Sequence, residues 1–210
     1  LRAEASLAQY VGAQDGTSGS AKYGNQTVDT LGIQGATPEM IYVGKLEVAQ
    51  GRYIESVDED NRRTSVFIGY DVATALFPHS DPLGKEIRLD GRPYTVIGVA
   101  KQIGTVLGQP QDNFAIIPLS NFLKSYGGRR SLAVSVRARQ GVTLEQVEEQ
   151  VRTIMRGRHH LAFDKRDDFA IVTDAAIENL FGQIIGIVSA IFIPITLIAL
   201  VVGGIVIMNI

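Results

Sequence analysis

The sequence predicts an α+β fold, in which a body of strands and helices is followed by one long C-terminal helix. Three observations support this prediction. Short apolar or alternating runs separated by Gly, Pro and Asp indicate several strands within residues 26–138. Apolar residues at helical spacing indicate helices at residues 71–77 and 143–155. Residues 179–210 hold no charged side chain, although 20% of the chain is charged.

Composition excludes some classes of function. The net charge is −2 and no block of basic residues stands out, so nucleic acid is not expected as a partner. The chain has no cysteine, which is compatible with reducing and oxidising compartments alike. Its 210 residues suffice for one domain or two small ones. Because residue 1 is Leu and the last residue lies in an apolar run, we expect the chain to be part of a longer protein.

The first third of the chain predicts few regular elements. Residues 11–25 are rich in Gly, Ser, Thr and Asp and are expected to form a loop. Residues 26–33 alternate and predict a strand, and residues 66–69 predict a short buried strand. A short helix is expected at residues 71–77, ended by Pro78.

The clearest local prediction is a β-hairpin. Residues 85–89 alternate apolar with charged side chains, and residues 92–99 form the returning strand. Asp90 and Gly91 lie between them and suit a two-residue turn with positive φ. A further apolar strand is expected at residues 114–117.

A strand, a helix and a second strand are predicted next, as a βαβ-like unit. Residues 132–138 are the first strand. Thr143 and Gln146 have the spacing of a capping box, which opens a helix whose apolar residues share one face. Residues 169–172 are expected to form the second strand.

The C-terminal segment predicts a membrane helix with a stalk. Residues 184–208 are a 25-residue run without Asp, Glu, Lys, Arg, His, Asn or Gln, and roughly 20 apolar residues suffice to cross a bilayer. A buried core helix is the weaker alternative, because core helices are usually shorter and keep a polar stripe. A helix opened by Thr173 and Asp174 and running to residue 210 would be about 54 Å long. The hydrocarbon core takes up only ~30 Å, so the first turns should stand outside it.

Five residues mark the predicted transmembrane segment. Ile184 and Met208 bound the apolar run. Pro194 should kink the helix near its middle, which membrane helices tolerate. Gly203 and Gly204 offer a point of close approach for a neighbouring helix.

Motifs for nucleotide binding and nucleophilic catalysis do not match. Gly84 and Lys85 superficially suggest a phosphate loop, but His79 stands where the first Gly is needed and Glu86 where Ser or Thr is needed. Ser18 lacks the Gly spacing of a nucleophile elbow. We therefore predict no catalytic residue and no ATP binding by this route.

The candidate metal-binding and acid/base residues are also better explained as polar side chains on the surface. His159 and His160 are adjacent, whereas a metal-binding pair on a helix needs i, i+4 spacing. Asp58, Glu59 and Asp60 are expected to form a solvated charge cluster. Neither group predicts a metal site, and no cofactor is predicted.

Several motifs, taken in order from about residue 33, cover most of the chain. They are Gly51-Arg52-Tyr53, Val66-Phe67-Ile68-Gly69, Leu76-Phe77-Pro78, Asp81-Pro82-Leu83-Gly84-Lys85-Glu86-Ile87, Tyr94-Thr95-Val96-Ile97-Gly98-Val99, residues 112–118, His159-His160 and Asp168-Phe169. Together they resemble the periplasmic core domain of MacB-like ABC transporter permeases. Residues 200–210 resemble the start of the FtsX-like permease region, its second transmembrane helix.

The resemblance implies a type VII ABC system. Such a permease has four transmembrane helices and a large extracytoplasmic domain between the first two. The implied partners are a second permease subunit, as a homo- or heterodimer, a cytoplasmic ABC ATPase domain, the lipid bilayer, and in some systems a periplasmic adaptor protein and an outer-membrane channel. The implied location is the inner (plasma) membrane, with residues before about 180 on the periplasmic side. ATP-driven movement would pass along the helices to the external domain, a process called mechanotransmission.

The resemblance also implies a division into two lobes and a stalk. Residues 1–32 and 128–173 would form a discontinuous, Porter-like α/β lobe. Residues 33–127 would form an inserted, Sabre-like β-rich lobe. Residues 174–210 would be the stalk and transmembrane helix.

Two other classes of function remain as alternatives. One is a membrane-anchored ligand-binding or sensor ectodomain, and the other is a membrane-tethered enzyme, which the missing catalytic residues disfavour. Residues beyond 210 would distinguish a permease, with two more apolar helices, from a sensor with a signalling domain. The substrate stays open, because macrolides, peptides, lipoproteins and toxins are all compatible.

Overall fold

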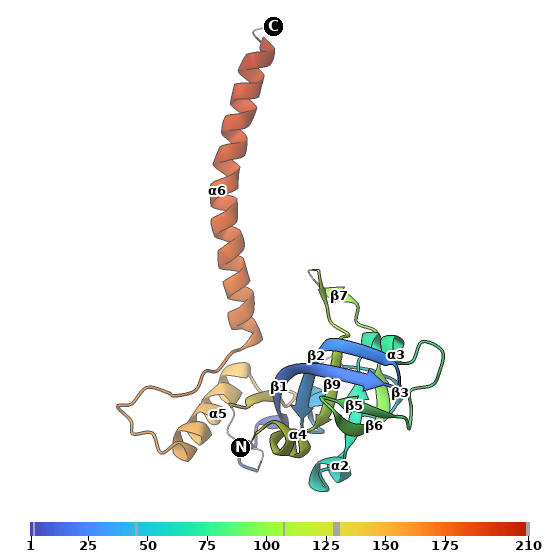
Figure 1. Cartoon of the computed structure of the whole chain (residues 1–210). Coiled ribbons are helices and arrows are strands. Elements are labelled where there is room, and N and C mark those ends of the chain that lie inside the picture. The colour runs from blue at the N-terminus through green and yellow to red at the C-terminus, as the bar shows by residue number, and fades with distance from the viewer. Residues whose placement is uncertain (2, 45, 107, 128–130, 209–210) are drawn as a thin grey trace. The chain divides into compact units, whose positions relative to one another are not determined.

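One mixed β-sheet organises the fold (Figure 1). The computed structural model describes residues 1–210 except 2, 45, 107, 128–130 and 209–210; in the C-terminal helix it gives the backbone, but not the side chains, of residues 174–180, 197–198 and 201–208. The elements follow the order β1 (Ala8–Tyr23), β2 (Gln26–Ala36), α1 (Met40–Val43), β3 (Val48–Gly51), α2 (Ser56–Asp60), β4 (Ser65–Ile68), α3 (Tyr70–Leu76), β5 (Glu86–Leu89), β6 (Arg92–Ala100), β7 (Thr105–Val106), β8 (Gln109–Pro110), β9 (Phe114–Pro118), α4 (Leu119–Tyr126), β10 (Ala133–Ala138), α5 (Leu144–Arg158) and α6 (Asp174–Met208).

The sheet has the strand order β10-β1-β2-β9-β4-β6-β3, and β5 pairs with both β1 and β6. The pairs β2/β9 and β4/β6 are parallel, and the other pairs are antiparallel. A separate two-stranded sheet is formed by β7 and β8. The chain divides into two compact units, Leu1–Ile154 and Met155–Ile210. The first unit, called the body below, contains the sheet.

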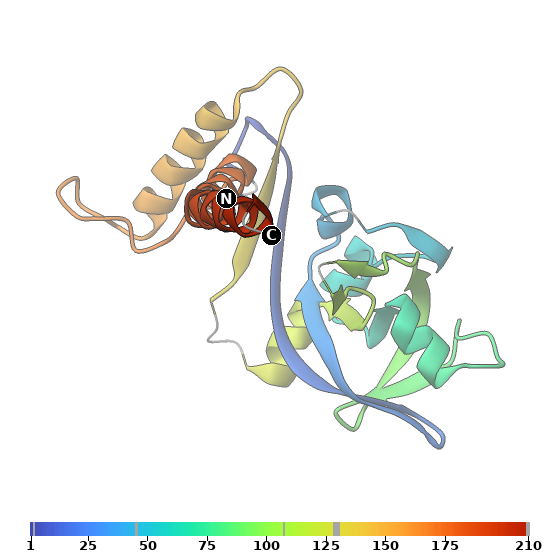
Figure 2. The same cartoon turned by 90° about the horizontal axis from the view of Figure 1, so that it is seen from above.

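The prediction of a loop at residues 11–25 is wrong, because β1 runs through most of this segment. Figure 2 shows β1 as a long, bent strand, which pairs with β10 through Gln14 and with β2 beyond it. Its small residues allow close packing that larger ones would prevent. A Cβ on Gly12 would lie 2.5 Å from Met40 Sδ, and a Cβ on Gly19 would lie 2.4 Å from Ile33 Cδ1. The glycines of residues 11–25, which suggested a loop, are therefore positions in a strand where neighbouring side chains approach the backbone closely.

The sheet is buried on both faces in its central strands. In β4, Val66 and Ile68 join one core cluster, together with side chains of α3 and α4, while Phe67 between them joins a second cluster. Alternate residues of a strand point to opposite faces, so both faces of β4 are covered. The same alternation divides β9. This explains why both strands appear in the sequence as continuous apolar runs.

Most of the predicted elements are confirmed with shifts of a few residues at their ends. The hairpin forms as β5 and β6, and φ is 46° at Asp90 and 81° at Gly91, as the predicted turn requires. The capping box also forms: Thr143 N donates to Gln146 Oε1 at 3.1 Å, and Gln146 N donates to Thr143 Oγ1 at 3.4 Å.

The strand predicted at residues 169–172 is wrong, and so is the βαβ-like unit. These residues have no strand pairing, and the described part of the second compact unit contains no strand with which they could pair. A strand is stable only when its backbone groups find partners, which a short apolar run in the sequence cannot guarantee. The short helices α1, α2 and α4 were not predicted. Met40 of α1 and Phe122 of α4 belong to the core clusters, whereas Val57 of α2 is 49% exposed.

The C-terminal helix α6 begins at Asp174, as predicted, and continues through Pro194 to Met208. The predicted lobe boundary at residues 32/33 lies within β2, and the sheet contains strands from both predicted lobes. The division into lobes stays a prediction.

Candidate functional site

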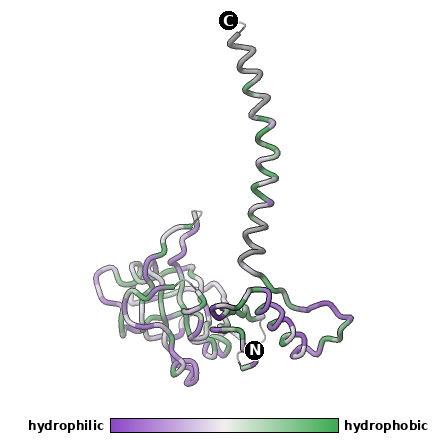
Figure 3. The backbone as a smooth tube through the Cα atoms, turned by 180° about the vertical axis from the view of Figure 1, so that it is seen from behind, coloured by the Kyte–Doolittle hydropathy of each residue, from purple (hydrophilic) through white to green (hydrophobic). Residues whose placement is uncertain are grey.

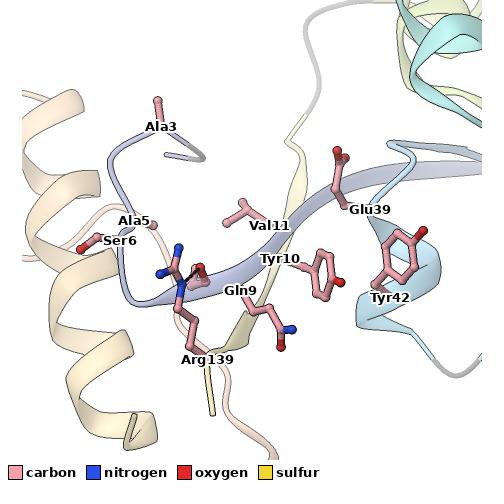
Figure 4. A pocket seen from close by; sticks show the side chains of 10 residues that line it. Ala3, Ala5, Ser6, Gln9, Tyr10, Val11, Glu39, Tyr42 and Arg139 are labelled. Carbon is pink, nitrogen blue, oxygen red and sulfur yellow. Dashed lines mark hydrogen bonds between the residues drawn. The ribbon is translucent and has the colours of Figure 1, made fainter. Parts of the chain in front are cut away.

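Two surface hollows of the body meet at helix α1. The first has a volume of about 430 Å³, and Figure 4 shows the side chains around it. Tyr10 of β1 and Tyr42 of α1 stack in its wall, with ring centroids 4.7 Å apart and planes inclined by 19°. The other lining residues are Ala3, Ala5, Ser6, Ala8, Gln9, Val11, Glu39 and Arg139.

Two arginines from the region of β10 connect the walls of this first hollow. Arg139 Nε donates to the Ala8 carbonyl at 3.1 Å, and Arg137 Nη1 donates to the Tyr42 carbonyl at 2.7 Å. Residues far apart in the sequence are thus joined by charge-assisted hydrogen bonds. The first hollow is consequently defined by β1, α1 and β10 together.

The second hollow shares Glu39 and Tyr42 with the first and has a volume of about 560 Å³. Its remaining lining residues come from the start of α1, from β3 and from the segment that leads into α2: Pro38, Ile41, Val48, Tyr53, Ile54, Glu55, Ser56 and Val57. Tyr53 and Ile54 also belong to the second core cluster. The second hollow therefore lies directly over the core of the body.

A buried ion cluster supports the segment beside the second hollow. Asp58 is only 1% exposed, and both of its carboxylate oxygens accept from Arg52, with Nη2–Oδ1 at 3.1 Å. Arg63 Nη1 lies 3.6 Å from Asp58 Oδ1, and Glu55 N donates to Asp58 Oδ2 at 3.0 Å. The prediction of a solvated cluster is thus wrong for Asp58, which is held by a bidentate arginine and by the first turn of α2.

Electrostatics differ between the two neighbouring carboxylates. Burial of Asp58 favours its neutral form, but the hydrogen bonds and charges of Arg52 and Arg63 outweigh this effect, so the pKa of Asp58 is lowered. Burial raises the pKa of Glu59, despite hydrogen bonds from Ser120. Ser120 N donates to Glu59 Oε1 at 2.9 Å, and Ser120 Oγ donates to the Glu59 carbonyl at 2.7 Å. These contacts fasten α2 to the start of α4.

Asp112 holds the base of the β7–β8 hairpin, which projects from the sheet in Figure 1. Its carboxylate is 1% exposed and accepts from Ile103 N at 2.9 Å and Gly104 N at 2.6 Å. Although its backbone is held by Asp112, the Ile103 side chain is 48% exposed, and the Val106 side chain of β7 is 51% exposed. The body thus uses a buried carboxylate to fix a hairpin whose own side chains face solvent.

In the second compact unit, His159 makes structural contacts. His159 Nδ1 lies 2.7 Å from Asp168 Oδ1, and its ring contacts Phe169 edge-on at 5.7 Å. Arg156 donates to the carbonyls of Ala162 and Lys165 and pairs with Asp167. Across the described residues, no group of three or more His, Cys, Asp or Glu side chains is arranged to hold a metal ion.

The residues predicted to mark a transmembrane segment lie along α6. Ile184 is 49% exposed, and Pro194 lies within the helix. Gly203, Gly204 and Met208 fall outside the residues whose side chains are described. Figure 3 shows hydrophobic residues along the described part of α6. Where the structure describes the chain, it contains no helix with the length and hydropathy to span a membrane.

Sequence reasoning missed the roles of Arg52 and Asp112. Both belong to motifs that carry the family resemblance, and both act through contacts with the backbone or with buried carboxylates. The sequence did contain one signal for these roles: in each case a charged residue stands in a motif that is otherwise apolar or contains glycine. Such a residue needs a partner if it is buried, but the sequence does not say which one.

The fold and these surfaces define a mixed α+β domain that ends in a long helix. The comparisons with known proteins identify its family. The model of the family described as "MacB-like periplasmic core domain" matches residues 1–154, and the chain belongs to this family.

Curated relatives of this chain are export proteins. The chain is 31% identical over 167 residues to "Macrolide export ATP-binding/permease protein MacB" of Azoarcus sp. (strain BH72), covering 78% of this chain and 24% of the relative. It is 27% identical over 199 residues to "Pyoverdine export ATP-binding/permease protein PvdT" of Pseudomonas syringae pv. syringae (strain B728a), covering 93% and 30% respectively. The chain therefore spans less than a third of the length of these relatives.

Solved structures share the fold. The periplasmic region of MacB from Actinobacillus actinomycetemcomitans matches with a TM-score of 0.72 and 24% identity, covering 84% of this chain and 77% of that one. The extracellular domain of the noncanonic ABC-type transporter YknZ from Gram-positive bacteria matches with a TM-score of 0.62 and 22% identity, covering 74% and 79%. At these identities the likeness concerns the fold alone.

Proposed function

We propose that the chain is the extracytoplasmic domain, with the start of the second transmembrane helix, of an ABC transporter permease that exports its substrate. The observation that carries the proposal is the family match over residues 1–154, followed after residues 155–173 by the 35-residue helix α6. The relatives named for ATP binding, permease activity and export support the same function.

Helix α6 is the proposed link to the inner (plasma) membrane. At ~1.5 Å per residue its 35 residues extend about 52 Å, more than the ~30 Å of a hydrocarbon core. Ile185, Ile187 and Ile193 are each 63% exposed, as expected of a helix that is apolar on every side and is covered by lipid. Residues 184–208 carry no charged side chain, so the sequence predicts the same apolar surface for the part of α6 whose side chains the structure does not describe. Residues before about 180 would lie on the periplasmic side.

Pro194 fits this role without interrupting the helix. Proline has no N–H, so the carbonyl of residue 190 loses its helical hydrogen bond, a loss that membrane helices tolerate. Thr196 Oγ1 donates to the Phe192 carbonyl at 2.8 Å, and α6 continues through Pro194 to Met208.

The proposed mechanism is mechanotransmission through α6. ATP hydrolysis would take place in a cytoplasmic ABC ATPase domain, and this chain itself would bind and hydrolyse no nucleotide. A continuous helix would carry the resulting displacement to the body, where the Porter-like and Sabre-like lobes would move relative to those of a second permease subunit. The projecting hairpin and the two hollows offer surfaces for that subunit, or for a periplasmic adaptor protein that leads to an outer-membrane channel.

The test is a pair of seven-residue insertions between residues 177 and 180 in the complete transporter. Seven residues add about two helical turns, or roughly 10 Å, in either variant. A Gly/Ser-rich insertion breaks the helix, since each Gly costs ~1 kcal/mol relative to Ala. An Ala-rich insertion keeps the helix and serves as the matched control.

We expect the Gly/Ser variant to hydrolyse ATP but to lose most substrate export, while the Ala-rich variant keeps more export for each ATP hydrolysed. ATPase rate and export are measured on the same preparations. Wild-type ratios of export to hydrolysis in both variants would show that α6 is only a tether.

A further inference from the structure

We propose that residues 156–169 form a rigid clasp that shortens the connector between α5 and α6, and that Arg156 is the positioning residue that closes this clasp. The proposal rests on the proposed function of α6 as a mechanical link, because only a short connector passes a displacement of α6 to the body. It is argued from the contacts of Arg156, from the turn that ends α5 and from the pairing of His159 with Asp168.

The segment between α5 and α6 is long for a mechanical connection. Residues 159–173 are all described and contain turns and bends but no helix or strand. Helix α5 begins in the body and ends at Arg158 in the second compact unit, and α6 begins at Asp174. A flexible chain of about 15 residues has an r.m.s. end-to-end distance of roughly 20 Å. A smaller movement of α6 would be lost in such a connector before it reached the body.

One guanidinium holds much of this segment against the last turn of α5. Arg156 Nη2 donates to the Ala162 carbonyl at 2.7 Å, and Arg156 Nη1 donates to the Lys165 carbonyl at 3.0 Å. Arg156 Nη1 also donates to the carboxylate of Asp167, and both side chains are 24% exposed. The planar fork of a guanidinium fixes the directions of such bonds, whereas a lysine ammonium does not. Arg156 thereby gathers residues 162–167 around one side chain.

The turn at the end of α5 fixes the first residues of the clasp. Leu161 N donates to the Arg156 carbonyl at 3.0 Å. His160 N donates to the Gly157 carbonyl at 3.2 Å, and φ at His160 is 52°. These two bonds around a residue in the left-handed region are the Schellman arrangement that ends many helices. The chain therefore leaves α5 in a direction that its own backbone determines.

A second side-chain pair closes the far end of the clasp. His159 Nδ1 lies 2.7 Å from Asp168 Oδ1, and the His159 ring contacts Phe169 edge-on. The paired side chains are 36% and 53% exposed, so this pair alone contributes little and Arg156 is the main closure. The clasp joins two motifs of the family resemblance, His159-His160 and Asp168-Phe169. Once it is closed, only residues 170–173 remain as a free connector.

Spin labels in the complete transporter, with its ATPase and in lipid nanodiscs, test the clasp. This chain has no cysteine, and any cysteines elsewhere in the transporter are replaced. A single label at Asp164→Cys reports the mobility of the clasp. A label pair at Thr153→Cys and Gln183→Cys reports the distance between α5 and α6, and excess unlabelled protein suppresses pairs between subunits. The parent is compared with Arg156→Ala and with Arg166→Ala, which changes an exposed side chain of the same segment.

In the parent we expect a restricted label at residue 164 and a narrow distribution of the 153–183 distance, both without nucleotide and after trapping with ATP and vanadate. Arg156→Ala should free the label. It should also widen the distance distribution about twofold, because the reach of a flexible chain grows with the square root of its length and about 15 residues replace about 4. Arg166→Ala should match the parent. Both variants should keep the ATPase rate and the urea midpoint of the body, which excludes a general loss of structure.

A mobile label in the parent, or equal distance distributions in the parent and Arg156→Ala, would overturn the clasp. A parent distance that changes with nucleotide by more than the width of its distribution would overturn it as well. The paired insertions in α6 test the proposed function separately. If export stays coupled to hydrolysis in the Gly/Ser insertion while Arg156→Ala widens the distribution, the clasp is supported and the mechanical role of α6 is contradicted.

Discussion

Isoleucine side chains have opposite surroundings in the sheet and in α6. Ile33, Ile68 and Ile117 of the sheet are fully buried against other side chains of the body. Ile185, Ile187 and Ile193 of α6 are each 63% exposed. Burial of an isoleucine contributes about 1.5–3 kcal/mol, so the sheet satisfies its apolar residues internally whereas α6 needs an external apolar environment.

The difference teaches how one chain can combine a folded domain with a helix whose described apolar side chains lie exposed. In the body, strands alternate between two core clusters, and the buried carboxylates of Asp58 and Asp112 are hydrogen-bonded. In α6, apolar residues occur on every side of the helix. Substitutions should therefore have large effects on stability in the body and small ones in α6.

The largest effect is expected from the matched pair Ile117→Ala and Ile193→Ala. Ile117→Ala leaves a cavity in the core and should lower the free energy of unfolding of the body by about 2–5 kcal/mol. Ile193→Ala should change the same quantity by less than about 0.5 kcal/mol. Urea unfolding followed by tyrosine fluorescence measures this, because all seven tyrosines lie before residue 127 and the chain has no Trp. Equal losses from both substitutions would contradict the contrast.

A smaller effect is expected where the sheet leaves no room for a side chain. A Cβ on Gly35 would lie 2.3 Å from the Cβ of Phe122, which is fully buried. Gly35→Ala should therefore cost about 1–3 kcal/mol through overpacking. Gly16→Ala in β1 is the matched control, since the atoms nearest to its new Cβ begin at 3.5 Å. If Gly35→Ala unfolds at the same urea concentration as Gly16→Ala, the described packing is wrong.

The next effect concerns the buried ion cluster and depends on pH. Asp58→Asn leaves Arg52 without its charged partner, and since Arg52 is 38% exposed we expect a cost of only about 1–2 kcal/mol at pH 7. The pKa of Asp58 is lowered in the folded state. Its stabilising contribution is therefore complete above the ordinary value of about 4 and is lost as the pH falls through the lower, folded-state value.

The measurement is urea unfolding of wild type and Asp58→Asn between pH 7 and pH 2. The difference between the two should be constant down to about pH 4 and then shrink. Asp60→Asn, at an exposed position of the same helix, is the control and should behave like the wild type. A difference that grows as the pH falls would contradict the lowered pKa of Asp58.

Local signals in the sequence predicted the parts of the fold that depend on local chemistry. The Asp90-Gly91 turn and the Thr143–Gln146 capping box are confirmed, because a short segment decides both. Strand β1 was missed, since its glycines serve contacts with Met40 and Ile33, which only the tertiary structure brings near. Residues 169–172 are a short apolar run like that of a strand but have no strand partner.

The candidate site was less predictable than the fold for the same reason. The first hollow is assembled from segments that are far apart in the sequence, such as Tyr10 with Arg139. The second is lined by residues 38–57, whose elements converge only in the folded structure. The burial of Asp58 could not be inferred from a run of three acidic residues, because it depends on Arg52 and Arg63. The family, in contrast, was predicted correctly from the order of short motifs and is confirmed by the match over residues 1–154.

The central claim is that lipid covers the exposed apolar side chains of α6, and cysteine labelling tests it most directly. The chain has no native cysteine, so single substitutions give unambiguous labels. Ile193→Cys probes α6, and Ser80→Cys probes an exposed loop of the body. Spheroplasts that contain the complete protein are treated with a membrane-impermeant maleimide before and after denaturation in SDS. We predict that Ser80→Cys is labelled at once and that Ile193→Cys is labelled only after denaturation. Labelling of Ile193→Cys in intact spheroplasts at the rate of Ser80→Cys would contradict the claim.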